Sequence, residues 1–385
     1  MIKLLLDCTP LVAGGGLQVG LGTISNAILE PTLEVHLVCS PQIFAQLNSS
    51  HISKLKSLHV ITHTSGLKKL FLCSELKRYE NVVQPDITYT IFGPSFWKPK
   101  YPSVQGFALG KMLYPEVRER YKNRLQKYKE KLNDRVKKIL FLRNADYYWM
   151  ETDVVKSRFL DTFPSISPEK VFVIGNSYSP AFEKRSQAPS LVPSNNCKPF
   201  RFFVPASYYY HKNLEIIPHA CSLLRKRGIE EIQFIFSIPS SSAGWNKLSY
   251  LAEQLQVSNY ISTAGEIPND IIADYYASSD AVLCTSLVES STAVFPESFL
   301  SKRPLLVSKL DFATSICEDA ALYFNPLDPE DLADKMFELY KNSKLRDTLI
   351  EKGIQQLRSK YPSPSQKWGL QLRMLHDILK VRAET

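Results

Sequence analysis

Two glutamates, Glu289 and Glu297, enclose the segment ESSTAVFPE, which follows a short apolar run. We expect the run to be a strand and the segment to open a helix, with Glu297 about two turns inside it. Positions eight apart on a helix differ by only about 80°, so both carboxylates could address one ligand. Ser290, Ser291 and Thr292 at the expected helix start offer hydroxyls and free N–H groups to phosphate oxygens. The alternative is an ordinary helix cap with two surface acids, which would be favoured if the motif stood alone.

A second candidate site is the glycine-rich connection Gly14, Gly15 and Gly16, between an apolar run and a helical pattern. Such a connection lets backbone amides approach a phosphate or a sugar closely. With Gly20 the spacing is also compatible with a dinucleotide-binding loop, but that fold requires an acid at the end of the second strand. Here that strand ends in Val-Cys-Ser at 38–40, so a dehydrogenase is disfavoured.

The elements that must position these residues alternate between short apolar runs and helical patterns over 385 residues. This alternation predicts an α/β protein with parallel sheets covered by helices. A linker rich in proline and serine at 179–198 separates an N-terminal domain, 1–178, from a C-terminal domain, 199–361. A final helix at about 362–385 is expected to pack back on the first domain. The expected strands are 3–6, 34–39, 59–62, 87–91, 104–108, 147–150 and a run before Gly175 in the first domain, and 200–205, 233–237, 261–263, 281–285 and 304–307 in the second.

Composition excludes several protein classes. The N-terminal MIKLLLD is too short for the apolar core of a signal peptide, and no stretch approaches the ~18 apolar residues of a membrane helix, so we expect a cytosolic protein. The 7 cysteines include no C-x-x-C pair, which disfavours a zinc site and a disulfide framework. We also expect no other metal, because no D-x-D motif or histidine cluster is present.

Basic residues are concentrated in the first half of the chain. Residues 1–178 contain 24 Lys and Arg against 15 Asp and Glu, whereas residues 179–385 contain 23 of each kind. Many of the cations lie in a helix predicted over 113–140, which also has an apolar stripe. One interpretation is a solvated basic helix docked by its stripe. The other is a helix that faces anionic lipid headgroups through Lys127, Lys131 and Lys138.

Four motifs of the second half occur in a specific order. They are SYYYHKNLE (207–215), TAGEIPNDIIADYYASSDAVLCTSLVES (263–290), KRPLLVS (302–308) and AALYFNPLDPEDLA (320–333). Taken with the Glu-x7-Glu pair, they resemble the donor domain of family 4 retaining glycosyltransferases (glycosyl transferases group 1) of the GT-B fold. IGNSYSPAF at 174–182 resembles the interdomain crossing of that family, and the glycine-rich connection resembles its N-terminal loop. The resemblance implies two Rossmann-like, doubly wound domains facing across a cleft, with the C-terminal helix crossing back.

The resemblance implies a role for individual residues. Lys212 matches the lysine that neutralises the donor diphosphate, and Glu289 matches the acid that contacts the donor sugar. Glu297 matches the acid that binds the ribose hydroxyls. Glu266 and Ile267 match the loop against which the base packs.

Two positions depart from the family pattern. Ser207 stands where many members have an arginine, which removes one expected diphosphate cation. The stretch 105–108 (QGFA) stands where many have an acceptor-site histidine.

The resemblance implies a retaining glycosyltransferase without metal or cofactor, working peripherally on the cytoplasmic membrane face. Its expected partners are a nucleotide-sugar donor, a lipid-linked glycan acceptor and the anionic membrane surface. A UDP-sugar is favoured over a GDP-sugar as the donor, and no nucleic-acid partner is expected. Two alternatives stay open. A sugar-nucleotide epimerase of the same fold would change the donor without an acceptor, and a membrane-recruitment module would bind the donor without turnover.

Overall fold

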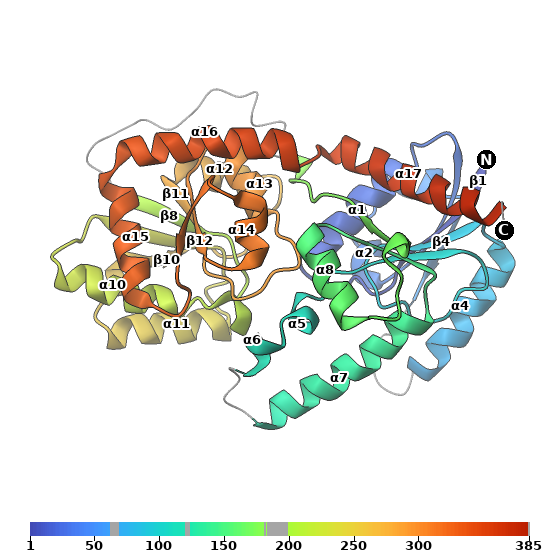
Figure 1. Ribbon diagram of the computed structural model, residues 1–385, viewed down its shortest axis with the longest axis horizontal. Coiled ribbons are helices and arrows are strands. Elements are labelled where there is room, and N and C mark those ends of the chain that lie inside the picture. Colours follow the sequence, from blue (N-terminus) through green and yellow to red (C-terminus); the bar gives the residue numbers. More distant parts are fainter. Residues whose placement is uncertain (62–68, 120–123, 181, 183–198, 384–385) are drawn as a thin grey trace. The chain divides into compact units, whose positions relative to one another are not determined.

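The computed structural model describes residues 1–61, 69–119, 124–180, 182 and 199–383 and divides into two compact units (Figure 1). Unit 1 comprises Met1–Gly175 and Ser363–Thr385, and unit 2 comprises Asn176–Pro362. Most of the linker expected at 179–198 lies outside the described residues.

Seven parallel strands form the sheet of unit 1, in the order β3-β2-β1-β4-β5-β6-β7. On β1, Leu4 and Leu6 pack in a core shared with helices α1 and α17, whereas Leu5 packs against α4. Both faces of this sheet are therefore covered, as expected for a doubly wound domain. The strands are β1 (Ile2–Cys8), β2 (Leu33–Cys39), β3 (Ser57–Val60), β4 (Ile87–Thr90), β5 (Ser103–Gly106), β6 (Tyr147–Met150) and β7 (Val171–Val173).

The helices of unit 1 correct one prediction. The helix expected over 113–140 does not begin at Leu113, because Tyr114 leaves the helical conformation (φ −122°, ψ 70°) immediately before Pro115, where a new helix starts. Proline disfavours helical geometry at the residue before it. Residues 120–123 of the prediction lie outside the described residues. The helices are α1 (Gly15–Ala27), α2 (Pro41–Phe44), α3 (Ser49–Lys54), α4 (Lys69–Val83), α5 (Gly110–Leu113), α6 (Pro115–Glu119), α7 (Arg124–Arg143), α8 (Asp153–Thr162) and α17 (Pro364–Ala383).

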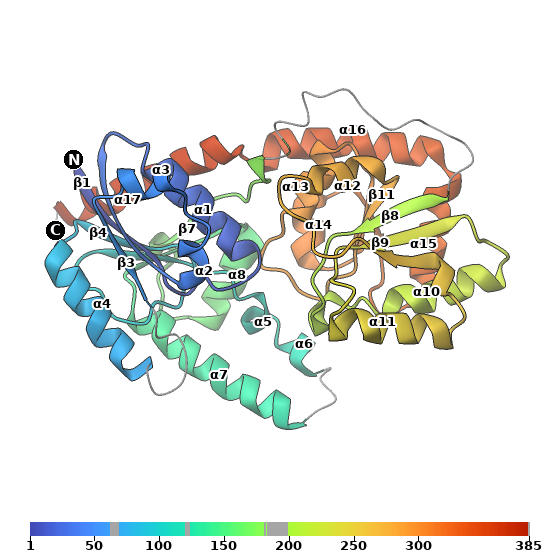
Figure 2. The same ribbon diagram turned by 180° about the vertical axis from the view of Figure 1, so that it is seen from behind.

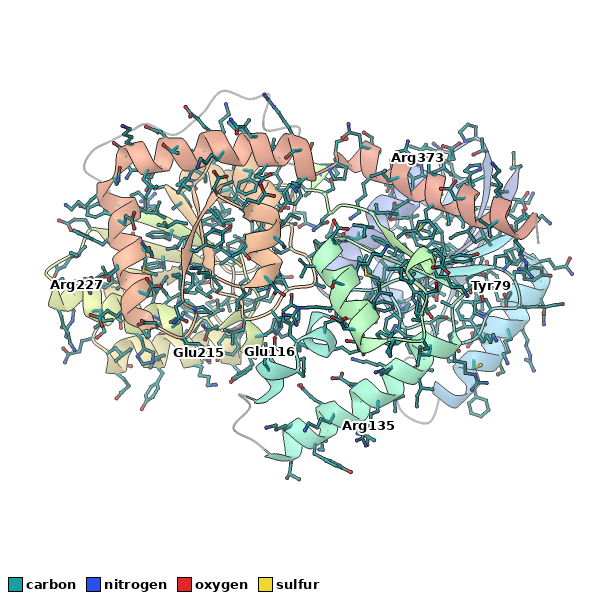
Figure 3. The ribbon with its side chains drawn as sticks, viewed as in Figure 1. Tyr79, Glu116, Arg135, Glu215, Arg227 and Arg373 are labelled. Carbon is teal, nitrogen blue, oxygen red and sulfur yellow. The ribbon has the colours of Figure 1, made fainter. Side chains whose placement is uncertain are left out.

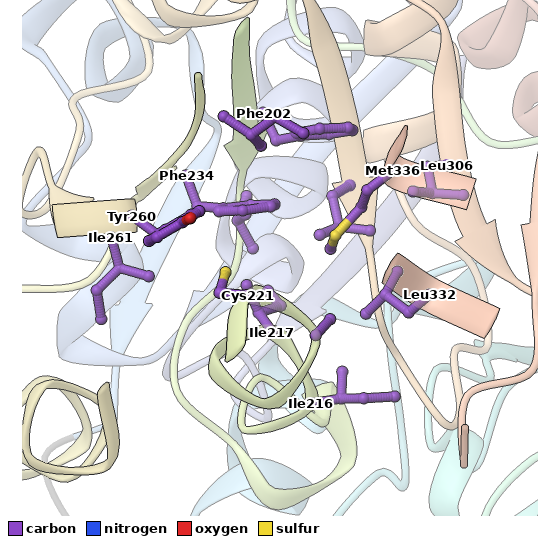
Figure 4. Packing of buried hydrophobic residues seen from close by; sticks show 14 of the residues in the cluster. Phe202, Ile216, Ile217, Cys221, Phe234, Tyr260, Ile261, Leu306, Leu332 and Met336 are labelled. Atoms are coloured by element: carbon purple, nitrogen blue, oxygen red, sulfur yellow. The ribbon is translucent and has the colours of Figure 1, made fainter. Parts of the chain in front are cut away.

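Six parallel strands form the sheet of unit 2, in the order β10-β9-β8-β11-β12-β13. Phe202 packs into the main core of this unit (Figure 4), whereas Phe203 faces two tyrosines of helix α12 on the opposite side. The last strand, Ala321–Phe324, was not among those expected. The strands are β8 (Phe200–Val204), β9 (Ile232–Phe236), β10 (Ile261–Thr263), β11 (Ala281–Cys284), β12 (Leu305–Ser308) and β13 (Ala321–Phe324).

Helices cover both faces of this second sheet, as the reverse view shows (Figure 2). None of the helices in the described ranges combines the length and the hydropathy needed to span a bilayer. The helices are α10 (Ile216–Lys226), α11 (Ala243–Gln254), α12 (Ile272–Ser278), α13 (Val294–Leu300), α14 (Asp311–Cys317), α15 (Pro329–Lys341) and α16 (Ser343–Lys360).

Both sheets contain a topological switch point, where the order of strands reverses. It lies between β1 and β4 in unit 1 and between β8 and β11 in unit 2. Open α/β sheets bind ligands at the carboxyl ends of the strands that flank such a point. The loops after β8 and β11 are therefore the first place to look for a site in unit 2.

Candidate functional site

Lys212 and Glu289 meet at the switch point of unit 2. Lys212 ends a 3-10 turn (Tyr210–Lys212) in the connection after β8, and Glu289 lies in the loop after β11. Because β8 and β11 are paired in parallel, these two connections leave the same edge of the sheet. The Lys212 Nζ lies 2.5 Å from Oε1 of Glu289, and the two side chains are only 18% and 11% exposed. Two residues 77 positions apart in sequence thus form one ion pair.

Backbone contacts hold the two loops together. The Thr285 hydroxyl donates to the carbonyl of Lys212 at 2.6 Å, and the N–H of Leu287 donates to the carbonyl of His211 at 2.7 Å. Asn213 adopts a left-handed conformation (φ 52°), which asparagine tolerates better than most residues. Its side-chain amide donates to the carbonyl of Pro326 at 2.8 Å. The lysine is therefore fixed through its backbone as well as its side chain.

The pair also has a distinct electrostatic environment. Burial is the largest single effect and acts to lower the pKa of Lys212. The Glu289 carboxylate, with smaller contributions from Cys284 and Tyr209, opposes it, and the pKa lies above its ordinary value. The Ser286 hydroxyl donates to the same Glu289 oxygen at 2.6 Å. The site therefore presents a permanently charged ammonium group next to an oriented carboxylate. Thr285 and Ser286 were not singled out from the sequence, although they directly follow the apolar run of β11.

The relation between Glu289 and Glu297 differs from the prediction. Helix α13 begins only at Val294, so Glu289 lies in the preceding loop, and Glu297 lies in the first helical turn rather than about two turns in. Pro296 explains the late start, because proline is tolerated only in the first turn of a helix. The argument that the two acids share one helix face is therefore wrong.

Ser290, Ser291 and Thr292 likewise precede the helix rather than start it. All three are half-buried in the loop that links the two glutamates, and the Thr292 hydroxyl accepts from the N–H of Val294 at 3.3 Å.

Glu297 is the most enclosed acid of the site, with 7% exposure. Burial raises its pKa to about 7, against smaller opposing effects of the Tyr276 hydroxyl and the backbone N–H of Ser179. That N–H donates to Oε1 of Glu297 at 3.4 Å. Ser179 belongs to the segment IGNSYSPAF, so this segment contacts the second glutamate.

The other predicted donor residues lie in loops after neighbouring strands. Ser207 is exposed between β8 and the 3-10 turn. Glu266 is exposed and Ile267 half-buried after β10, where Gly265 has a positive φ of 79°. Within the described part of the chain, no hydrogen bond or ion pair joins these residues to the Lys212–Glu289 pair. The structure therefore places them on the same sheet edge without bringing them together.

In unit 1, only one of the three consecutive glycines precedes the helix. Gly14 has a φ of 68° and occupies the N-cap, whereas Gly15 and Gly16 are the first two residues of α1. A Cβ atom added to Gly15 would meet no other atom within 4 Å, so its backbone is open to a ligand. The expectation of a three-glycine loop is thus corrected to one left-handed glycine and a glycine-rich first turn.

Gln105 fills a structural role at the position of the missing acceptor-site histidine. Its carbonyl oxygen accepts from the N–H of Ser95 at 3.0 Å, and its amide donates to the carbonyl of Phe141 at 3.2 Å. The residue is fully buried and anchors α7 to the sheet.

The three predicted membrane-facing lysines are not equivalent. Lys131 is exposed, whereas Lys127 and Lys138 are half-buried, and the Lys138 Nζ lies 5.4 Å from the centre of the Phe163 ring. Within the described ranges, no group of three His, Cys, Asp or Glu side chains is placed to hold a metal ion. The absence of a metal requirement stays a prediction.

Comparisons with known proteins show a family match in the second half of the chain and a shared fold. Residues 192–356 match the family model of the glycosyl transferases group 1. No curated protein matches the sequence. A glycosyltransferase from Rickettsia africae is similar in structure, with a TM-score of 0.72, 16% identity and coverage of 98% of this chain and 99% of that chain.

Two further structures have the same architecture. Anabaena HepE in complex with UDP and glucose gives a TM-score of 0.72 at 15% identity, covering 98% of this chain and 100% of that chain. WaaG, a glycosyltransferase involved in lipopolysaccharide biosynthesis, gives a TM-score of 0.68 at 14% identity. The match covers 96% of this chain and 99% of that chain. The chain has the GT-B fold, and its residues 192–356 match the model of the glycosyl transferases group 1.

Proposed function

We propose that this chain, a GT-B protein with a group 1 glycosyltransferase domain, is a retaining glycosyltransferase that moves a sugar from a UDP-sugar to a lipid-linked glycan. The observation that carries the proposal is the Lys212–Glu289 pair at the switch point of unit 2. A buried ammonium group beside an oriented carboxylate supplies what a sugar diphosphate requires, a cation for the phosphates and an acceptor for sugar hydroxyls.

The proposed reaction exchanges one bond of the anomeric carbon for another. The acceptor hydroxyl attacks that carbon on the face from which the diphosphate departs. As the bond to the diphosphate oxygen breaks, Lys212 neutralises the growing negative charge, and the leaving β-phosphate takes the acceptor proton. Glu289 orients the sugar and Glu297 accepts hydrogen bonds from the ribose. Neither residue forms a covalent bond, so no enzymic nucleophile is required.

The proposal includes no metal, because Lys212 and the backbone N–H groups of the loop 290–293 supply positive charge near the diphosphate. The proposed donor nucleotide is UDP rather than GDP, because the structure of HepE contains UDP and glucose. A lipid-linked acceptor is supported by the likeness to WaaG and by the cations of the first half of the chain. The same cations support peripheral association with the cytoplasmic face of a membrane.

The test starts with melting temperatures against a panel of UDP- and GDP-sugars, because a bound donor stabilises the folded state by mass action. The stabilising donor is then incubated with lipid-linked oligosaccharides, with and without EDTA. We expect UDP release coupled to sugar transfer, an unchanged anomeric configuration and no effect of EDTA.

Other outcomes would contradict parts of this assignment. An inverted product would exclude the retaining mechanism, and loss of turnover in EDTA would exclude a metal-free reaction. An epimerised donor formed without acceptor would identify an epimerase. Donor binding without any turnover would leave a recruitment module.

A further inference from the structure

Helix α7 turns its apolar side outward. Its large apolar residues recur every three or four positions and so share one face. In a helix that packs on its domain this face is buried, but here Leu125, Tyr128 and Ile139 are 73%, 68% and 60% exposed. The exposed apolar stripe consists of Leu125, Tyr128, Leu132, Val136, Ile139 and Leu142.

The opposite side of α7 is polar and less exposed. Lys127, Glu130, Asp134 and Lys137 are all half-buried there. Among the described side chains of α7, the one fully buried apolar anchor is Phe141 near the C-terminal end, which packs among Phe107, Phe159 and Phe163. Figure 1 shows α7 along the outside of unit 1, with its N-terminal end projecting beyond the neighbouring helices of that unit. The stripe is therefore not needed to attach the helix.

Positive charge flanks the stripe. Helix α7 contains eight basic residues and two acidic ones. Lys129, Lys131, Arg135 and Arg143 are exposed, and Arg135 is labelled on α7 in Figure 3. A basic helix of 20 residues with a continuous apolar face is the pattern of helices that lie in the plane of a membrane interface.

We propose that α7 inserts its exposed apolar stripe into the interfacial region of an anionic bilayer, with the flanking cations on the lipid headgroups. This differs from attraction of lysines alone, because the apolar side chains enter the acyl boundary and supply most of the binding. It rests on the proposed function only in that a lipid-linked acceptor explains why the enzyme is held at a membrane.

The charges favour a bilayer over a second copy of this chain. Two α7 helices that met through their stripes would bring two clusters of excess positive charge together, which is unfavourable. An anionic lipid surface complements the same charge, at about 1 kcal/mol per basic residue near it. The six side chains of the stripe supply apolar area without an acidic residue among them.

The experiment compares the complete protein with two matched triple variants. The stripe variant carries the substitutions Leu132→Gln, Val136→Gln and Ile139→Gln. Glutamine is chosen because its helix propensity is high. The control replaces the exposed residues Leu29→Gln, Val82→Gln and Leu327→Gln elsewhere. Binding is measured by co-sedimentation with vesicles of phosphatidylcholine containing about 30% phosphatidylglycerol, without nucleotide or glycan, and with phosphatidylcholine alone.

We expect the stripe variant to bind the anionic vesicles at least tenfold more weakly, since each lost apolar side chain removes buried area. The control variant should bind like the wild type. Circular dichroism and UDP binding should be unchanged in both variants. Insertion itself is read from Leu132→Trp, whose fluorescence should be quenched by lipids brominated in the acyl chains, whereas that of Leu29→Trp should not.

Three results would overturn the inference. The first is wild-type vesicle binding that the stripe variant retains. The second is absence of quenching at position 132. The third is a dimer in sedimentation equilibrium that only the stripe variant loses, which would assign the stripe to self-association. The vesicle-binding and quenching assays use neither donor nor acceptor. Insertion can therefore hold while the transferase assignment fails, and the transferase assignment can hold while insertion fails.

Discussion

At the residue scale, the candidate site depends on a few placed groups rather than on bulk charge. The half of the chain that contains Lys212 has as many acidic as basic residues, so an anionic donor must be recognised locally. Lys212 is fixed by Glu289 and by the hydroxyl of Thr285 at its own carbonyl. Ser286 in turn fixes Glu289, which makes it a positioning residue of the pair.

Replacing Glu289→Gln should lower kcat at least about 100-fold, the scale of one lost oriented transition-state contact. The affinity for UDP should stay within a few-fold of wild type, because UDP lacks the sugar that Glu289 is proposed to orient. Steady-state kinetics and calorimetry check the two quantities. The exposed Glu253→Gln on α11 is the matched control, and unchanged kcat in Glu289→Gln would remove this residue from the mechanism.

Lys212→Ala should reduce both UDP affinity and kcat, since the diphosphate loses its cation in the ground state and in the transition state. Calorimetry with UDP and with uridine separates the phosphate contribution from that of the nucleoside. We expect uridine binding to be unchanged. Normal UDP affinity in this variant would contradict the assigned role.

If Glu297 binds the donor ribose as proposed, donor binding should depend on pH. Burial raises the pKa of its carboxyl to about 7, so it is mostly neutral at pH 6 and mostly ionised at pH 8. Because the ionised form is the better acceptor for ribose hydroxyls, UDP-sugar affinity should rise about tenfold over this range. Calorimetry at several pH values tests it, with Glu297→Gln expected to flatten the profile. If UDP-sugar affinity depended on pH equally in the wild type and in the Glu297→Gln variant, the effect would belong to another group.

The same shift in the pKa of Glu297 has the opposite pH dependence for stability. Donor binding should improve as the pH rises, whereas the stability of the folded protein should fall. The folded pKa of about 7 lies above the ordinary value of 4.5, so the folded state binds the proton more tightly. The stabilisation from this group is fully present below about 4.5 and is lost as the pH rises through about 7. The ligand-free protein should therefore lose this contribution over the range in which donor binding improves.

At the scale of elements, α17 is tied to unit 1 by a buried ion pair. Its Lys367 Nζ lies 2.5 Å from Oε1 of Glu151, which follows β6, and both side chains are only 9% exposed. Further along the helix, the Gln371 amide donates to the Tyr89 hydroxyl at 2.9 Å. The apolar residues of α17, among them Leu375, complete the core over β1 and β4. The last helix of the chain is thus part of the first folding unit.

Lys367→Ala should destabilise unit 1 by about 3 kcal/mol, because it leaves the Glu151 carboxylate buried without its partner. Pairing Lys367→Met with Glu151→Leu should recover most of this loss. Hydrogen exchange of β1 and β4 amides under increasing urea measures the effect within unit 1. The exposed Lys380→Ala on the same helix is the control, and a similar loss in that variant would refute the assignment to the buried pair.

At the scale of the whole molecule, the excess of basic over acidic residues lies in the first half of the chain, whereas the candidate donor site lies in the second half. Raising NaCl from about 0.05 to 0.5 M should weaken binding to anionic vesicles, because exposed charges of α7 are screened. Donor affinity should change little, since the Lys212–Glu289 pair is largely buried. Co-sedimentation and calorimetry at both salt concentrations test this separation, and an equal salt dependence of the two would contradict it.

The sequence by itself determined the architecture and singled out candidate site residues. Alternating apolar runs and helical patterns predict two doubly wound sheets, because both periods are local properties of the chain. Ordered motifs singled out Lys212, Glu289 and Glu297 as candidates for a donor site. Even the start of α13 was encoded in Pro296, a local signal that the prediction overlooked.

The tertiary structure alone decided which side chains meet and which face solvent. The ion pair of Lys212 with Glu289 depends on the pairing of β8 with β11, which no local pattern specifies. The raised pKa of Glu297 depends on burial by residues distant in sequence. Periodicity likewise identifies the apolar stripe of α7, but not whether another element covers it. Burial is a property of the assembled chain, and here it leaves that stripe exposed.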